Sequence, residues 1–127
     1  MAKRQSVNFP GFSHQNPIPN ASRIGNVMMT SVISGVDPGT RNLPPELSKQ
    51  VTNLFTHVRT AIQQAGGTPD DIIKMTVWLK DRSQRAPVNA EWQKMFPNEH
   101  SRPARHALQM DMDGGAQVQC DFTAVIA

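Results

Sequence analysis

The chain has 127 residues, a formal net charge of +3 and 38% hydrophobic residues, which is enough for one domain, 1–127, around one core. Its single cysteine, Cys120, excludes an intrachain disulfide and a multi-cysteine zinc site and is typical of a cytoplasmic protein. The sequence has neither an apolar run near the roughly 20 residues that span a bilayer nor a basic stripe interleaved with aromatics, so we expect no membrane or nucleic-acid partner.

The first half of the chain predicts a loop, a strand and a long helix. Residues 1–23 are polar and contain three prolines, so we expect an extended or looped segment. Residues 26–34 are typical of a strand that is apolar on both faces. Apolar residues then recur at helical spacing from Leu47 to Ala65, which predicts an amphipathic helix that ends at Gly66. This spacing places Gln50 on the polar face, and we expect His57 at the surface.

The second half predicts a strand, a short helix and two further strands. In the strand 72–80, Ile73, Met75, Val77 and Leu79 form the apolar face. A helix over 87–96 follows, with Val88, Trp92, Met95 and Phe96 on its inner side, and Pro97 ends it.

Strands 105–110 and 117–126 each alternate apolar and polar residues, and we predict that they form a hairpin. Asp113-Gly114-Gly115 suits a three-residue hairpin loop. Direct pairing would then join the polar residues of both strands on one face, and would turn the apolar set toward the core. The polar set is Arg105, Ala107, Gln109, Gln119, Asp121 and Thr123. The apolar set includes His106, Leu108, Met110 and Cys120.

These elements predict an α+β fold in which two helices cover one face of a small sheet. The other face is too apolar for water, with Met28, Val32, Ile72 and Trp78 expected there. We therefore expect a subunit interface on that face, with Arg105 in a cleft at its edge.

Three segments resemble a known family: residues 25–31 (GNVMMTS), residues 71–81 (DIIKMTVWLKD) and residues 102–105 (RPAR). They resemble the reactive intermediate deaminase family (Rid, also YjgF). The resemblance implies a chorismate-mutase-like mixed sheet with two helices on one face, assembled as a homotrimer with clefts between subunits. It also implies hydrolysis of a small enamine or imine, such as 2-aminoacrylate, to a keto acid and ammonia. No metal or organic cofactor is implied, and the only other partner is a small carboxylate.

The resemblance assigns roles to individual residues. Arg105 matches the arginine that clamps the substrate carboxylate, a role that its planar fork of donors suits. Further substrate contacts are implied for Ser31, Asn89, Pro103 and Ala107. Gln119 stands where the family has a glutamate that positions water.

Three departures from the family suggest a divergent branch with a different ligand. A glutamine orients water but does not take its proton, and Asp121 is the carboxylate that could substitute. The family's usual cysteine is Ala107 here. An early tyrosine is missing, and the loop containing His14 stands in its place.

The residues alone leave other roles open. Arg105 could form an ion pair within the trimer, for instance with Asp121. Asn89 could bond the start of a helix, Ser31 could be an ordinary strand serine, and His14 could be solvated.

Two alternative functions also stay open. One is a trimer that binds a keto acid without turnover. The other is an aminomuconate-type deaminase of a ring-degradation pathway, in which the His14 loop accommodates a second carboxylate.

Overall fold

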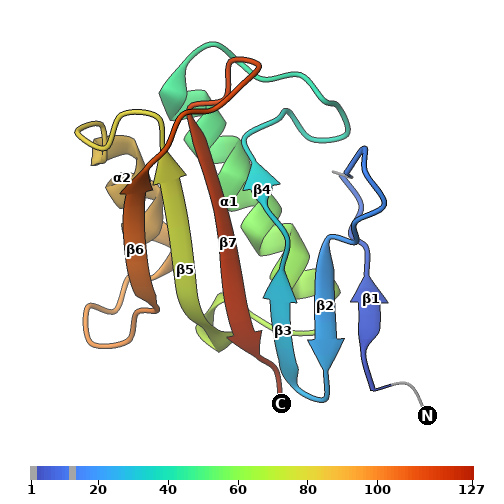
Figure 1. Cartoon of the computed structure of the whole chain (residues 1–127). Helices are drawn as coiled ribbons and strands as arrows, with labels where there is room; N and C mark the ends of the chain where they lie inside the picture. The colour runs from blue at the N-terminus through green and yellow to red at the C-terminus, as the bar shows by residue number, and fades with distance from the viewer. Residues whose placement is uncertain (1–2, 12–13) are drawn as a thin grey trace.

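A computed structural model describes residues 3–11 and 14–127 of the chain and shows one sheet with two helices behind it (Figure 1). The elements in chain order are β1 (Gln5–Val7), β2 (Ala21–Ile24), β3 (Val27–Thr30), β4 (Ile33–Ser34), α1 (Leu47–Gln64), the 3₁₀ turn η1 (Pro69–Asp71), β5 (Ile72–Leu79), α2 (Ala86–Met95), β6 (Ala104–Gln109) and β7 (Val118–Val125). The predicted α+β class is confirmed, with both helices on one face of a mixed sheet.

The strands lie in the order β1-β2-β3-β7-β5-β6, and β4 also pairs with β7. Every pairing is antiparallel except that of β5 with β6. The single strand expected over residues 26–34 is divided into β3 and β4. Neither helix of the described chain combines the length and apolar character that crossing a bilayer requires.

The predicted hairpin of the last two strands is wrong, because β5 lies between β6 and β7. After β5 the chain passes through α2 and returns as a parallel neighbour, which is the usual crossover geometry. Met75 on β5 then pairs with Arg105 on one side and Phe122 on the other. Arg105 therefore faces the helices, whereas Asp121 and Gln119 face the opposite side of the sheet.

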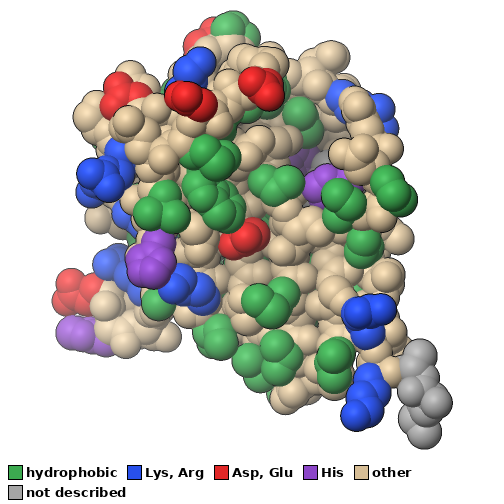
Figure 2. All heavy atoms as spheres, in the orientation of Figure 1, with side chains coloured by type: hydrophobic (Ala, Val, Ile, Leu, Met, Phe, Trp, Pro, Cys, Tyr) green, Lys and Arg blue, Asp and Glu red, His purple; other side chains and the backbone are tan. Residues whose placement is uncertain are grey.

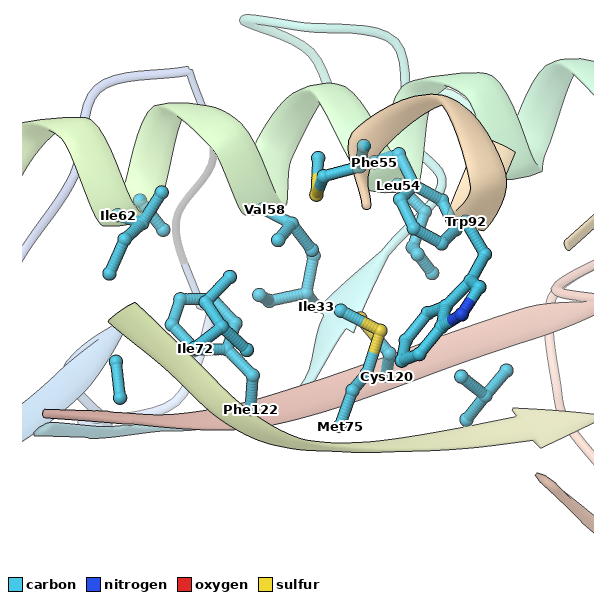
Figure 3. Packing of buried hydrophobic residues seen from close by; sticks show 14 of the residues in the cluster. Ile33, Leu54, Phe55, Val58, Ile62, Ile72, Met75, Trp92, Cys120 and Phe122 are labelled. Atoms are coloured by element: carbon cyan, nitrogen blue, oxygen red, sulfur yellow. The ribbon is translucent and has the colours of Figure 1, made fainter. Parts of the chain in front are cut away.

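The core fills the space between the sheet and the helices, as Figure 3 shows for residues such as Ile62, Phe122 and Met75. Helix α1 ends as predicted, because Gly66 adopts a φ of 87° that favours glycine. Cys120 is fully buried, and its burial raises the pKa of the thiol far above the usual range. The predicted core position of Cys120 is thus confirmed.

Two polar residues of α1 are buried, contrary to prediction. Gln50 donates to the carbonyls of Pro44 and Gly115 and accepts from the Gln117 N–H. His57 Nε2 lies 2.8 Å from the Val36 carbonyl oxygen. Both side chains fix loops to the helix, which explains why apolar periodicity alone misplaced them.

The helix-free face is apolar as predicted and includes Trp78, and Val32 is exposed, but two of the residues predicted there lie elsewhere. Met28 and Ile72 are buried in the core instead, and an irregularity in the β5–β7 pairing at Ile72–Lys74 leaves Ile73 52% exposed. Exposed apolar side chains gather over this face (Figure 2). They include Ile24, Val27, Met29, Ile73, Leu108 and Val125. His106, Leu108 and Met110, expected toward the core, are exposed because the parallel pairing with β5 reverses the predicted orientation of β6.

Candidate functional site

Arg105 lies on the edge strand β6 with its side chain toward α2. Its Nη2 donates to Asn89 Oδ1 at 2.8 Å, and its guanidinium carbon lies 4.9 Å from the centre of the Trp92 ring. Arg105 is half-buried. A hydrogen bond at one nitrogen and an aromatic face beneath the plane together set the orientation of the guanidinium.

The guanidinium retains unused binding capacity. Its Nη1 is buried and has no hydrogen-bond partner, and no described carboxylate lies within ion-pair distance of it. Burial lowers the pKa of Arg105, and the charge of Arg85 lowers it further. The group stays charged, because an arginine pKa begins above 12. A buried cationic donor without a partner favours an anion that supplies the missing acceptor.

Asn89 and Trp92 come from neighbouring positions of α2. Residues three apart on a helix lie on the same side, so both meet Arg105. Trp92 also contacts Phe96 edge to face, with 4.7 Å between ring centres. Its core position is as predicted, but its contact with Arg105 was missed. The sequence did contain a signal for this contact, because Trp92 lies three residues after Asn89 and therefore on the same side of the helix.

Ala107 and Pro103 flank Arg105 along β6. Ala107 pairs with Val77 and faces the helices like Arg105, since the two residues are two positions apart on one strand. Pro103 immediately precedes the strand, and both residues are half-buried. The small side chain of Ala107 leaves room beside the guanidinium on this face.

Ser31 and His14 do not join Arg105 within one chain. Ser31 follows β3, which β7 and β5 separate from β6 in the sheet. Its Oγ donates to the Pro19 carbonyl at 2.7 Å, so it holds the N-terminal segment against the sheet. His14 is half-buried, and its Nε2 is buried without a hydrogen-bond partner.

Gln119 and Asp121 occupy the helix-free face, so the predicted common polar face with Arg105 is wrong. Asp121 pairs with Thr76, and Gln119 pairs with Trp78. Burial raises the pKa of the Asp121 carboxyl group. The chain therefore carries the Arg105 guanidinium on one side of the sheet and the Asp121 carboxylate on the other. Among the described residues, no cluster of three or more His, Cys, Asp or Glu side chains is suited to hold a metal ion.

Comparisons with known proteins identify the family. The family model described as Endoribonuclease L-PSP matches residues 13–126. A RutC family protein of Haemophilus influenzae is 32% identical over 81% of this chain and 83% of its own. A protein of Escherichia coli K12 named 2-iminobutanoate/2-iminopropanoate deaminase is 31% identical over 68% of this chain and 69% of its own.

Solved structures agree with the sequence comparisons. The YjgF gene product of E. coli superposes with a TM-score of 0.82 at 25% identity, covering 95% of this chain and 98% of its own. RidA from the Antarctic bacterium Psychrobacter sp. PAMC 21119 gives 0.83 at 25% identity, covering 99% and 100%. The chain therefore belongs to the Rid (YjgF, Endoribonuclease L-PSP) family.

Proposed function

We propose that this protein hydrolyses a small carboxylate-bearing imine or enamine to a keto acid and ammonia. The observation that carries the proposal is the half-buried Arg105, which Asn89 and Trp92 orient and whose Nη1 lacks an acceptor. A carboxylate on this guanidinium would form short charge-assisted hydrogen bonds. The E. coli relative named as an iminobutanoate and iminopropanoate deaminase supports the same substrate class.

The chemistry needs one water and no redox partner. An enamine first tautomerises to its imine without change in composition. Water then adds to the imine carbon, with its oxygen bonding to carbon and one proton moving to nitrogen. The resulting carbinolamine transfers its hydroxyl proton to nitrogen as the C–N bond breaks, which releases ammonia and leaves the keto acid. The protein contributes mainly orientation and a fixed electrostatic environment.

The water-activating group in this proposal comes from a second subunit. Asp121 and Gln119 lie on the sheet face opposite Arg105, so neither meets a substrate held by Arg105 of the same chain. Packing the apolar helix-free face against a neighbouring copy would form an intersubunit cleft containing both partial sites. Asp121 is the better base of the two, because a carboxylate with a raised pKa takes a proton and an amide does not.

The test is the rate at which 2-aminoacrylate, generated in place, becomes pyruvate. We expect the wild-type protein to exceed the buffer rate and Arg105→Gln to lose most of the gain. Arg59→Gln is the matched control, because Arg59 is an exposed arginine of α1. A wild-type rate equal to that of buffer, across several small imines, would contradict the hydrolytic function. Keto-acid binding that depends on Arg105 without turnover would instead favour a metabolite-binding trimer.

A further inference from the structure

A second arginine, Arg85, immediately precedes α2, one helical turn before Asn89. The Arg85 carbonyl accepts the Asn89 backbone N–H at 2.9 Å, and the Asn89 side chain binds Arg105. The backbone of Arg85 therefore lies one helical turn before the residue whose side chain binds Arg105. The charge of Arg85 is also felt at Arg105, where it adds to the effect of burial in lowering the pKa.

Neither arginine is neutralised within the described chain. The ion pairs among described residues lie elsewhere and join Lys49 to Glu46, Lys94 to Glu91 and His100 to Glu99. Arg85 donates from its Nε only to a backbone oxygen, that of Arg82, at 3.0 Å. Two neighbouring like charges without a counter-charge repel each other, and a bound anion would remove that repulsion.

An open hollow of about 490 Å³ lies at Arg85 and is lined by Asp81, Arg82, Ser83, Arg85 and Gln109. Gln109 lies on β6 on the same face as Arg105 and Ala107, because each is two residues from the next. A strip of surface therefore leads from Arg105 over the small Ala107 to the hollow at Arg85.

The acidic residue of the hollow, Asp81, is hydrogen-bonded within its own loop. Its Oδ1 accepts from both the backbone N–H and the hydroxyl of Ser83, at 3.0 and 2.7 Å. It forms no ion pair with Arg82 or Arg85. The positive charge of the hollow thus stays available to a ligand.

We propose that Arg85 binds a second anionic group and that the substrate is the imine of a small dicarboxylic keto acid. The carboxylate next to the imine carbon would lie on Arg105, the carbon chain over Ala107, and the distal carboxylate on Arg85. The choice of an imine rests on the proposed function, whereas the two-anion site follows from the arrangement of the arginines. The reaction is the hydrolysis described above, and the distal carboxylate takes no part in the bond changes.

Calorimetric titration with 2-oxoglutarate and 2-oxobutanoate tests this assignment. The two keto acids differ in the distal carboxylate. We expect the wild-type protein to bind 2-oxoglutarate at least about ten-fold more tightly, as one charge-assisted contact allows. Arg85→Gln should remove that preference, because it should weaken the binding of 2-oxoglutarate at least about ten-fold more than that of 2-oxobutanoate. Arg105→Gln should weaken the binding of both keto acids. Arg59→Gln removes only one distant charge and should leave the affinity for each keto acid nearly unchanged.

The outcomes separate this inference from the proposed function. If Arg85→Gln weakens the binding of both keto acids equally, or of neither, then Arg85 is not a second anion-binding residue. The hydrolysis is measured in parallel with 2-iminoglutarate formed in place from glutamate by an amino-acid oxidase. A wild-type preference for 2-oxoglutarate that Arg85→Gln abolishes, together with no hydrolysis of the imine above buffer, would retain the two-anion site and overturn the hydrolytic function.

Discussion

The orientation of the Arg105 guanidinium depends on Trp92 as well as on strand β6. The aromatic face beneath the guanidinium, 4.9 Å from its carbon, stabilises the charge and limits how far the plane can tilt. The hydrogen bond to Asn89 acts at one nitrogen only. We therefore regard Trp92 as a positioning residue for Arg105, in addition to its place in the core.

Replacing Trp92 should weaken ligand binding in proportion to the loss of the ring. We expect Trp92→Leu to raise the Kd for a keto acid about 3- to 30-fold, which corresponds to a cation–π contact of about 0.5–2 kcal/mol. Trp92→Phe keeps an aromatic face and should retain most of the affinity. Calorimetry measures the Kd, and urea unfolding shows whether each variant is folded. Equal loss in the two variants would contradict a role for the aromatic face.

Asp121 should make the protein less stable as pH rises, whereas a carboxylate in an ion pair makes a protein more stable as pH rises. Burial raises the pKa of its carboxyl group above the ordinary value of 3.8. The protonated form is therefore favoured in the folded state. The contribution of Asp121 to the free energy of unfolding consequently falls as pH rises from below 3.8 through the raised pKa. Asp121→Asn should be more stable than the wild type at pH 7, and this advantage should shrink toward pH 3.

Urea unfolding at a series of pH values measures this effect. Asp70→Asn replaces an exposed aspartate and serves as the control for charge alone. An advantage of Asp121→Asn that is the same at pH 3 and pH 7 would show that the carboxyl pKa is not raised in the folded protein.

At the scale of the element, Gln50 connects α1 to two loops that lie far apart in the sequence. Its amide is fully buried and bonds Pro44, Gly115 and Gln117. Gly35 lies against the same turn of the helix, and a Cβ added there would lie 2.7 Å from the Cα of Gln50. Helix α1, the two loops and the end of β4 thus contact one another around the buried Gln50 amide.

Gln50→Leu should destabilise the protein, although the volume of the side chain is nearly kept. Two carbonyls and one N–H would lose their partner in a buried setting, which costs about 2–4 kcal/mol in the free energy of unfolding. Gln63→Leu on the exposed side of α1 is the matched control and should change stability by less than about 0.5 kcal/mol. Urea unfolding measures both variants, and similar stabilities would contradict a structural role for the Gln50 amide.

At the scale of the whole molecule, the helix-free face carries a group of exposed apolar side chains, which is typical of an interaction surface. Met29 is 59% exposed and pairs with Thr123 on this face. The face also carries Asp121, which the proposed reaction brings to Arg105 of a neighbour. Assembly and activity should therefore be lost together.

Light scattering should give the mass of three 14.0 kDa chains for the wild-type protein. Met29→Lys should dissociate the assembly, because association would bury an unpaired charge. Thr56→Lys adds the same charge to an exposed position of α1 and should leave the mass unchanged. A stable wild-type monomer would contradict both the interface and the completion of the site by a second subunit.

The sequence alone predicted the helices, the fold class and the family correctly, and it singled out Arg105 as the candidate ligand-binding residue. Helical spacing, glycine at the helix end and the Pro103-Ala104-Arg105 segment are local signals, and each depends on residues close together in the chain. The face on which Arg105 lies was decided only by the tertiary structure. Alternation within β6 and β7 shows which residues share a face of one strand, but which strand lies between them depends on distant contacts. Because β5 lies between β6 and β7 and runs parallel to β6, the Arg105 side chain faces α2 and the Asp121 side chain faces the opposite side of the sheet. Other tertiary contacts bury Gln50 and His57 against loops of the chain and place the Trp92 ring against the guanidinium.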